Sequence, residues 1–236
     1  SNFIRHLLAR EDFKGRIIES HFNGMLLKID NTEVWTRFIG EFNASNLLAV
    51  YSCARLLGQN KDLILRALST METVEGRFQY LQSEKGVTAV VDYAHTPDGI
   101  ERLCQSAREI TSGKLMILFG CGGDRDRGKR PLMGQVASKN CDFTFVTSDN
   151  PRTEEPQKII DDILPGISGK NFAVILDRKE AIREIIKRAE ANDTILIAGK
   201  GAEDYQEIGT KKFPFDDTTE VIAALEEIGY RKALLG

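Results

Sequence analysis

The sequence predicts an α/β protein in which most of the chain forms a mainly parallel sheet with helices on both faces. Five short segments between residues 87 and 198 read as strands, and the clearest of them, Leu115–Phe119, is wholly apolar, as is typical of a strand buried on both faces. Helical patterns lie between them, and this alternation is characteristic of a parallel sheet. Polar or glycine-rich segments follow four of the five strands, which places them together at the carboxyl edge of the sheet.

The elements of this larger part follow from periodicity and from helix start signals. Thr96 followed by Pro97 is a cap followed by a proline in the first turn, which marks the start of the first helix. The expected strands are Val87–Val91, Leu115–Phe119, Asp142–Thr147, Phe172–Leu176 and Thr194–Ala198. The expected helices are Pro97–Thr111, Pro131–Lys139, Glu154–Leu164, Arg178–Glu190 and Asp217–Ile228.

The part of the chain that precedes this sheet has a different pattern of apolar residues. A short helix is expected over residues 3–12, from the apolar pairs Phe3-Ile4 and Leu7-Leu8. Alternating runs and the turn signals Asn23-Gly24 and Asp30-Asn31 then predict an antiparallel meander. Its strands are expected at Arg16–Ser20, Met25–Ile29 and Val34–Phe38, and helices at Ser45–Leu57 and Lys61–Met71.

A meander with two helices is less than a complete domain, so we expect this part to be the back of a domain whose front lies upstream. The boundary is expected within Gly76–Glu84, which gives domains 1–78 and 79–236.

Composition excludes several classes of protein. The net charge of -3 argues against bulk binding to nucleic acid or membranes, and no apolar run is long enough to span a bilayer. The four cysteines are widely spaced and read as reduced thiols, and the three histidines are too scattered for a metal site. We therefore expect a cytoplasmic protein, and we also expect it to be monomeric.

The loop Gly120–Arg130 imitates a phosphate-binding P-loop but does not complete it. Gly123, Gly128 and Lys129 fit the spacing G-x-x-x-x-G-K. Arg130, however, stands where Ser or Thr should supply a magnesium-binding hydroxyl, and four charged residues, 124–127, occupy the part that would wrap a phosphate. An anion-binding loop that carries arginines is the better interpretation.

Three further loops follow strands, and each also has a purely structural interpretation. Thr96-Pro97 starts a helix, Asp149-Asn-Pro-Arg152 favours a turn, and a single histidine such as His95 is more often a surface residue than a catalyst. Gly199-Lys-Gly201 is a weak motif by itself. Four such loops at one edge nevertheless favour a binding site over coincidence.

Taken together, these motifs resemble the Mur ligase family, and most closely its diaminopimelate-adding members. The resemblance covers essentially the whole chain and rests on Asp92–Asp98, Phe119–Met133, Thr147–Arg152 and Gly199–Gln206, with Phe42–Asn46 and Gly76-Arg77. It implies that the chain is the tail of a central ATPase domain followed by a complete C-terminal Rossmann-like domain. The family's P-loop and magnesium ligands would lie upstream, so this fragment should be inactive alone.

The resemblance also implies a reaction. ATP, with Mg²⁺, converts a substrate carboxylate to an acyl phosphate, and an incoming amino group attacks it to give an amide, ADP and phosphate. The substrates would be meso-diaminopimelate and UDP-N-acetylmuramoyl-L-alanyl-D-glutamate, in the synthesis of peptidoglycan precursors for the cell wall. The resemblance assigns no certain catalytic residue and no metal ligand to this chain.

The residue roles come from the same resemblance. In the family a guanidinium at the position of Arg152 holds the second carboxylate that separates diaminopimelate from lysine. Ala202 departs from the family pattern, which has histidine there. The residues implied for diaminopimelate are Arg125, Asp149, Asn150, Pro151, Arg152, Gly199 and Glu203, and those for the nucleotide are Asn43, Asn46, Arg77, Asp92 and His95.

Three alternatives remain. A lysine-adding ligase is disfavoured by Arg152. A dinucleotide-dependent oxidoreductase would explain a glycine loop after a strand, but Arg125 stands where the third glycine of G-x-G-x-x-G belongs. A non-catalytic binding module could keep the same fold without the ATPase half.

Overall fold

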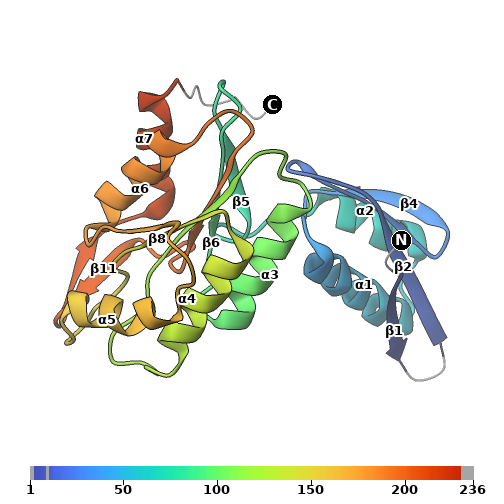
Figure 1. Cartoon of the computed structure of the whole chain (residues 1–236). Coiled ribbons are helices and arrows are strands. Elements are labelled where there is room, and N and C mark those ends of the chain that lie inside the picture. The colour runs from blue at the N-terminus through green and yellow to red at the C-terminus, as the bar shows by residue number, and fades with distance from the viewer. Residues whose placement is uncertain (1–2, 9–10, 230–236) are drawn as a thin grey trace. The chain divides into compact units, whose positions relative to one another are not determined.

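The computed structural model describes residues 3–8 and 11–229, and the chain divides into two compact units (Figure 1). The first unit is Ser1–Thr73 and the second is Val74–Gly236. The division lies a few residues before the boundary expected at 78/79. The assignment of the two units to particular domains of a longer enzyme stays a prediction.

The first unit is a four-stranded antiparallel sheet packed against two helices. Its strands are β1 (Phe3–Leu8), β2 (Glu11–His21), β3 (Gly24–Ile29) and β4 (Thr32–Thr36), paired in chain order, and its helices are α1 (Glu41–Leu56) and α2 (Lys61–Thr70). Alternate residues of β3, namely Met25, Leu27 and Ile29, are buried against Leu48 and Leu68 of the helices. The expected meander and both expected helices are present.

The helix expected over residues 3–12 is wrong. This segment forms β1 and the start of β2, which pair antiparallel from Phe3 opposite Arg16 to Leu8 opposite Glu11. A short apolar run fits either a helix face or a strand. Pairing with β2 decides the outcome, because so short a helix is only marginally stable without tertiary contacts.

The second unit contains a six-stranded, mainly parallel sheet, as predicted. Its strands are β5 (Gln79–Gln82), β6 (Thr88–Asp92), β7 (Leu115–Phe119), β8 (Phe143–Val146), β9 (Phe172–Val174) and β10 (Thr194–Ala198). The order is β5-β6-β10-β7-β8-β9, and only the edge strand β5 is antiparallel. β5 was not predicted, because its sequence Gln-Tyr-Leu-Gln carries no apolar run.

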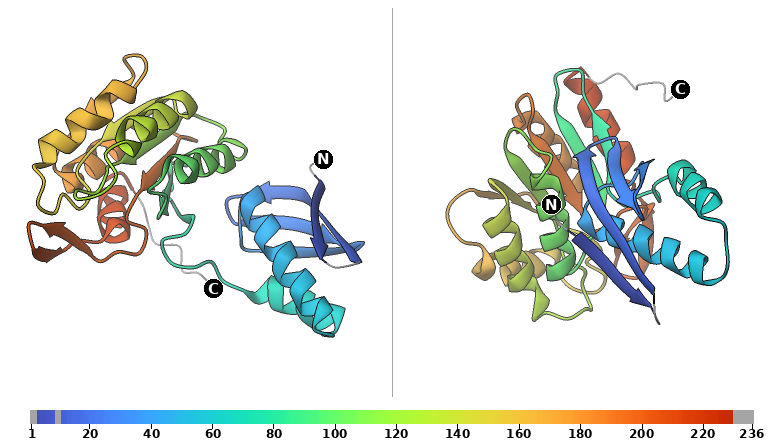
Figure 2. Two further views of the ribbon diagram at one scale, coloured as in Figure 1. Left: turned by 90° about the horizontal axis from the view of Figure 1, so that it is seen from below. Right: turned by 90° about the vertical axis from the view of Figure 1, so that its right-hand side faces the viewer.

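Helices cover both faces of this sheet, as predicted (Figures 1 and 2). On one side lie α3 (Pro97–Arg108), α4 (Lys129–Asn140) and α5 (Pro156–Ile163), and on the other α6 (Arg178–Arg188) and α7 (Asp217–Glu227). Alternate strand residues such as Val91, Leu118 and Ile197 pack against α6 and α7. Their neighbours are also buried, which explains the continuous apolar runs.

The position of β10 organises the carboxyl edge. Although it is the last strand of the sheet in sequence, it lies between β6 and β7, so the loop after β10 is flanked by the loops that follow those strands. A hairpin, β11 (Tyr205–Ile208) and β12 (Lys211–Pro214), comes next and was not predicted. Residue Arg152, from the loop after β8, forms a bridge with Ile208. Four loops that are distant in sequence thus meet at one edge.

A buried ion pair secures the end of β10. Arg178, at the start of α6, donates from Nε and Nη2 to the two carboxylate oxygens of Asp217, at the start of α7, over 2.8 and 2.7 Å. Nη2 also donates to the carbonyl oxygen of Ala198, the last residue of β10, over 3.0 Å. Both charged side chains are 0% exposed. The pair therefore ties two helix starts to the strand end from which the site begins.

Replacing Arg178 with Met should destabilise the second unit by about 3–5 kcal/mol, because Asp217 is left as a buried, unpaired charge. The measurement is the free energy of unfolding by chemical denaturation. The matched control is Arg183→Met on the same helix, whose pair with Glu227 is about half exposed; it should cost less than about 1 kcal/mol. Adding Asp217→Leu to Arg178→Met should recover most of the loss. Equal losses of stability in the two single variants would contradict the role given to the Arg178–Asp217 pair.

Candidate functional site

A pocket of about 530 Å³ lies at the carboxyl edge of the second unit's sheet. The loops after β6, β7, β8 and β10 all contribute to it, as the sequence predicts. The residues that line it are Tyr93, His95, Thr96, Gly120, Cys121, Gly122, Arg125, Asp126, Lys129, Arg130, Met133, Asp149, Asn150, Arg152, Gly199, Glu203 and Tyr205. Of the seven residues predicted for diaminopimelate, all except Pro151 line this pocket.

One end of the pocket is acidic. Asn150 donates from Nδ2 to Oε2 of Glu203 over 2.9 Å, and the Asp149 carboxylate lies beside Gly199. Gly199 has φ +122°, and a Cβ there would lie 2.6 Å from Oδ2 of Asp149. A side chain at residue 199 would therefore displace that carboxylate, so the glycine is required by close approach.

A buried lysine lies beneath this acidic end. The Lys200 ammonium is 0% exposed and donates to the carbonyl oxygen of Tyr205 over 2.7 Å and to Oδ1 of Asn150 over 2.9 Å. It also lies 3.4 Å from Oε2 of Glu203 and 3.8 Å from Oδ1 of Asp149. These contacts satisfy a cation that would otherwise be costly to bury.

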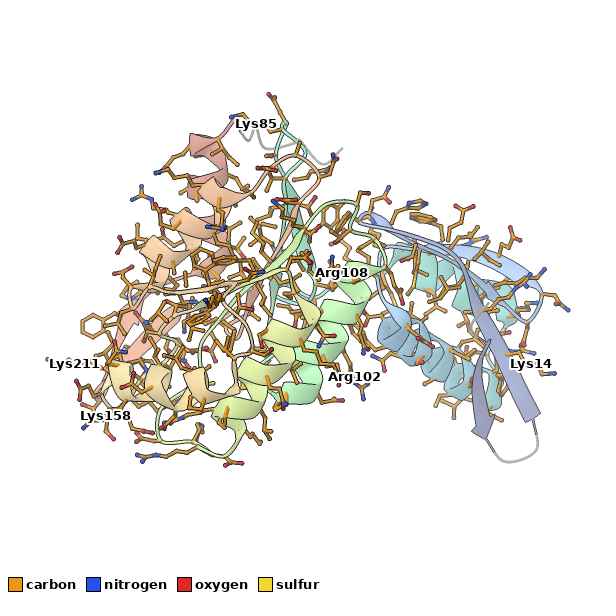
Figure 3. The ribbon with its side chains drawn as sticks, viewed as in Figure 1. Lys14, Lys85, Arg102, Arg108, Lys158 and Lys211 are labelled. Atoms are coloured by element: carbon orange, nitrogen blue, oxygen red, sulfur yellow. The ribbon has the colours of Figure 1, made fainter. Side chains whose placement is uncertain are left out.

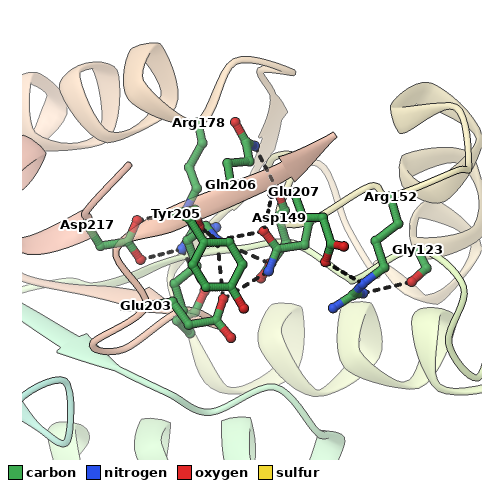
Figure 4. A network of polar contacts seen from close by, with 12 residues as sticks. Gly123, Asp149, Arg152, Arg178, Glu203, Tyr205, Gln206, Glu207 and Asp217 are labelled. Carbon is green, nitrogen blue, oxygen red and sulfur yellow. Dashed lines mark hydrogen bonds and ion pairs between the residues drawn. The ribbon is translucent and has the colours of Figure 1, made fainter. Parts of the chain in front are cut away.

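The other end of the pocket is basic. Arg152 donates from Nε to Glu207 over 3.0 Å and from Nη1 to the carbonyl oxygen of Gly123 over 2.8 Å (Figure 4). Its φ of +49° is unusual for a residue with a side chain, and backbone hydrogen bonds with Glu207 and Gly209 hold it there. Among the side chains of residues 13–229, Arg125 and Lys129 have no carboxylate partner. This end can therefore accept an anionic group.

The glycine loop itself is held by an internal ion cluster. Arg130 is 1% exposed; it donates to both oxygens of Glu154 and to Asp162 over 2.7–3.1 Å. Arg127 also pairs with Glu154, over 2.9 Å. Two of the loop's four cations, Arg127 and Arg130, are thus neutralised inside the protein, so Arg125 and Lys129 are the ones that remain for a bound anion. Arg130 serves the structure of the loop.

The backbone of this loop does not form an open phosphate cradle. The N–H of Gly123 donates to the carbonyl oxygen of Asn150, that of Asp124 to Glu154, and that of Gly128 to Asp126. A P-loop keeps such groups available for phosphate oxygens. Their engagement here agrees with the rejection of a nucleotide P-loop.

A second polar group borders the pocket. His95 donates from Nδ1 to the carbonyl oxygen of Tyr93 over 2.8 Å, which leaves Nε2 available. The Arg77 guanidinium lies over the Tyr93 ring at 4.8 Å. Asp92 is buried and accepts from the N–H groups of Phe78 and Ala94, and burial raises the pKa of its carboxyl. Three of the residues predicted for the nucleotide, Arg77, Asp92 and His95, therefore lie close together.

The other two predicted nucleotide residues belong to the first unit. Asn43 donates from its side-chain amide to the carbonyl oxygen of Ile39 over 2.8 Å, at the start of α1. Asn46 is exposed one turn later on the same helix. The pocket described above is built wholly from the second unit, so the two asparagines are not among its lining residues.

Several residues of the site were missed by the sequence reasoning. Lys200 carried a signal, since a lysine between two glycines directly after a buried strand is unusual. Gln206, which donates to the carbonyl oxygen of Asp149 over 2.7 Å, and Glu207 carried none, because their roles depend on the hairpin. Cys121 lines the pocket, but burial raises the pKa of its thiol to about 12, so it stays protonated at neutral pH.

The Glu154 carboxylate gives a test of the loop anchor. Its hydrogen bonds with Arg130 lower the pKa of this carboxyl from 4.5 to about 2. The stabilisation it provides is therefore complete above about pH 4.5 and is lost as the pH falls toward 2. Between pH 5 and 2.5 the free energy of unfolding should fall more steeply for the wild type than for Glu154→Gln. If the free energy of unfolding depends on pH equally in the two proteins, Glu154 does not hold the loop in this way.

Comparison with known proteins identifies the chain's relatives. Residues 76–201, more than half of the chain, match the family described as Mur ligase, glutamate ligase domain. The chain is 53% identical over 216 residues to the UDP-N-acetylmuramoyl-L-alanyl-D-glutamate--2,6-diaminopimelate ligase of Phocaeicola vulgatus, which covers 89% of this chain and 45% of that protein. It is 47% identical to the ligase of the same name from Aquifex aeolicus, over 92% of this chain and 44% of that protein. The chain thus spans slightly less than half the length of these relatives.

The solved structures to which this chain is similar also include ligases of this kind. A structure of a UDP-N-acetylmuramoyl-L-alanyl-D-glutamate--2,6-diaminopimelate ligase superposes with a TM-score of 0.67 at 36% identity, covering 94% of this chain and 46% of that one. The UDP-N-acetylmuramate-alanine ligase of Thermotoga maritima superposes with a TM-score of 0.62 at 19% identity, over 93% of this chain and 46% of that one, which shows the shared fold. From the family match, the high identities and the pocket at the carboxyl edge, we conclude that the chain belongs to the Mur ligase family.

Proposed function

We propose that the chain is part of an ATP-dependent ligase that joins meso-diaminopimelate to UDP-N-acetylmuramoyl-L-alanyl-D-glutamate, and that its pocket holds the diaminopimelate. The observation that carries this proposal is the separation of charge within the pocket. Its lining carries the carboxylates of Glu203 and Asp149, which lie against Asn150 and Lys200, and the cations of Arg125, Lys129 and Arg152, of which Arg152 is held separately by Glu207 and Gly123. An amino acid with an ammonium and a carboxylate at the end remote from the reaction matches this arrangement.

The proposed roles follow from the free atoms of each side chain. Arg152 uses Nε and part of Nη1 within the protein, which leaves Nη2 for a ligand carboxylate, and Arg125 can approach the same group. Glu203 and the carbonyl oxygen of Gly199 would accept from the ligand's distal ammonium. Asp149, Asn150 and Pro151 shape the loop that presents Arg152.

Discrimination against lysine follows from the basic end. Lysine lacks the second carboxylate, so it would leave the guanidinium of Arg152 without its partner after displacing water. A site built for a polar group rejects an analogue that lacks the group, because its own polar atoms then stay unpaired. The names of the similar ligases support diaminopimelate as the acceptor.

The chemistry proposed for the whole enzyme is attack of the acceptor's amino group on an acyl phosphate. When bound, ATP with Mg²⁺ would phosphorylate the carboxylate of the UDP-linked substrate with release of ADP, and phosphate would leave as the amide forms. Among the side chains that the structure describes, residues 13–229, no three His, Cys, Asp or Glu group as a cation site. The contribution of this chain is to hold diaminopimelate so that its amine is oriented for attack, which converts binding energy into positioning.

The nucleotide contacts belong to the same proposal. Asn43 and Asn46 of the first unit, with Arg77, Asp92 and His95 of the second, are proposed to border the nucleotide, the first unit being the tail of a central ATP-binding domain and the second the amino-acid-binding domain. Both Asp92 oxygens already accept backbone N–H groups, so Arg77 and Nε2 of His95 are the freer contacts.

The cellular setting is proposed as well. We place the enzyme in the cytoplasm as a monomer that acts on small molecules. Among the helices that the structure describes, none is long and apolar enough to cross a membrane.

The proposal is tested by calorimetric titration of the protein with meso-diaminopimelate, lysine and NAD. Diaminopimelate should bind, lysine should bind at least about tenfold more weakly, and NAD should not bind. Arg152→Ala should weaken diaminopimelate by about 1.5–3 kcal/mol, roughly 10- to 100-fold, through loss of charged hydrogen bonds, with lysine unchanged.

The matched control is Arg102→Ala, an exposed arginine on α3 that lies outside the pocket (Figure 3). It should bind both amino acids as the wild type does. Equal affinity of the wild type for lysine and diaminopimelate, or binding of NAD, would overturn the proposed function.

A further inference from the structure

We propose that Lys200 is a positioning residue of the acceptor pocket: its buried ammonium fixes the Asn150 amide and the Glu203 carboxylate so that one carboxylate oxygen faces the ligand's distal ammonium. This inference rests on the proposed function and deepens it. It concerns a residue that makes no ligand contact of its own.

The hydrogen-bonding capacity of Lys200 is used up inside the protein. An ammonium has three donors, and acceptors lie at 2.7 Å (Tyr205 carbonyl), 2.9 Å (Asn150 Oδ1) and 3.4 Å (Glu203 Oε2). The side chain is 0% exposed and is absent from the pocket lining. Lys200 therefore acts only through its neighbours.

The first neighbour is the Asn150 amide. Its Oδ1 accepts from Lys200 and from the backbone N–H of Glu207, both over 2.9 Å. With two donors on Oδ1, the amide is fixed in one orientation, and its Nδ2 donates to Oε2 of Glu203 over 2.9 Å. A flipped amide would place two N–H groups against Lys200 and Glu207.

The second neighbour is the Glu203 carboxylate. Both of its described donors, Asn150 and Lys200, contact Oε2. No donor within residues 11–229 contacts Oε1, so this oxygen is the one left to receive a ligand. The network thus divides the carboxylate into an anchored oxygen and a presented oxygen.

The balance of charged side chains around Glu203 also supports this role for its free oxygen. Three carboxylates, Asp149, Glu203 and Asp217, lie near two cations, Lys200 and Arg178. One negative charge is therefore in excess. Glu203 is the most exposed of the five, at 25%, so the excess is presented where it can meet one ammonium. The network matches a single cationic group.

The backbone explains why Lys200 can point inward. Gly201 has φ +54°, and a Cβ there would lie 2.8 Å from the Tyr93 side chain. The chain therefore turns tightly after β10, carries the lysine beneath the loop, and returns at Tyr205, whose carbonyl oxygen the ammonium meets.

The test compares two ligands on Lys200→Met. Diaminopimelate carries the distal ammonium, and 2-aminopimelate keeps both carboxylates and one amine but lacks that group. By calorimetry, the variant should bind diaminopimelate at least about tenfold more weakly and 2-aminopimelate within about twofold of the wild type. A purely electrostatic role predicts the opposite sign, since removing a nearby cation would strengthen the binding of an ammonium.

Two further variants sharpen the comparison. Lys158→Met, on α5, is the matched control, because this lysine is 75% exposed and points away from the fold (Figure 3); it should change neither affinity. Glu203→Gln should weaken diaminopimelate selectively, and adding Lys200→Met should cause little further loss, because the lysine acts through Glu203.

If Lys200→Met folds poorly, an NMR measurement on the wild type and on Lys200→Arg still tests the inference. In the wild type, the side-chain amide of Asn150 should give one pair of NMR signals that exchange slowly with water, and Lys200→Arg, which keeps the charge, should retain them in part. Equal weakening of both ligands, additive losses in the double variant, or unprotected Asn150 signals in the wild type would overturn the inference. Failure of the wild type to prefer diaminopimelate to lysine would instead overturn the proposed function, whatever the variants do.

Discussion

The ion pair between Arg178 and Asp217 lies at the point where two helices begin and the central strand ends. Taking two charges fully out of water is expensive, so both partners must meet with good geometry or the strand end would not stay dry. By binding the Ala198 carbonyl as well, Arg178 fixes the place from which Gly199, Lys200 and Glu203 depart. The acidic half of the pocket depends on this arrangement.

The basic half of the pocket also depends on a buried, ion-paired arginine. Arg130 is buried among Glu154, Asp162 and the Gly122 carbonyl, so the glycine loop is held from within. The internal carboxylates neutralise the cations that shape the loop and leave Arg125 and Lys129 uncompensated. Buried arginines thus determine the scaffold on both sides, and exposed or half-exposed charges remain for a ligand.

The two halves are linked through the hairpin that follows β10. The backbone N–H of Glu207 donates to Asn150 in the acidic half, and the Glu207 side chain accepts from Arg152 in the basic half. The spacing between the proposed ammonium site and the proposed carboxylate site is therefore set by one short strand. For a ligand that carries both groups at one end, this fixed spacing is a source of specificity.

Local patterns in the sequence predicted the parallel strands of the sheet, the helices that cover it and the loops that form the pocket, because buried parallel strands and helix caps carry strong local signals, as in Leu115–Phe119 and Thr96. Tertiary structure decided the rest. β1 is a strand because β2 pairs with it, and the hairpin at Tyr205–Pro214 forms without an apolar signal. The roles of Lys200, Glu207 and Arg130 depend mainly on partners 24–57 residues distant in the sequence. Such pairings are matters of distance in space, which local periodicity does not encode.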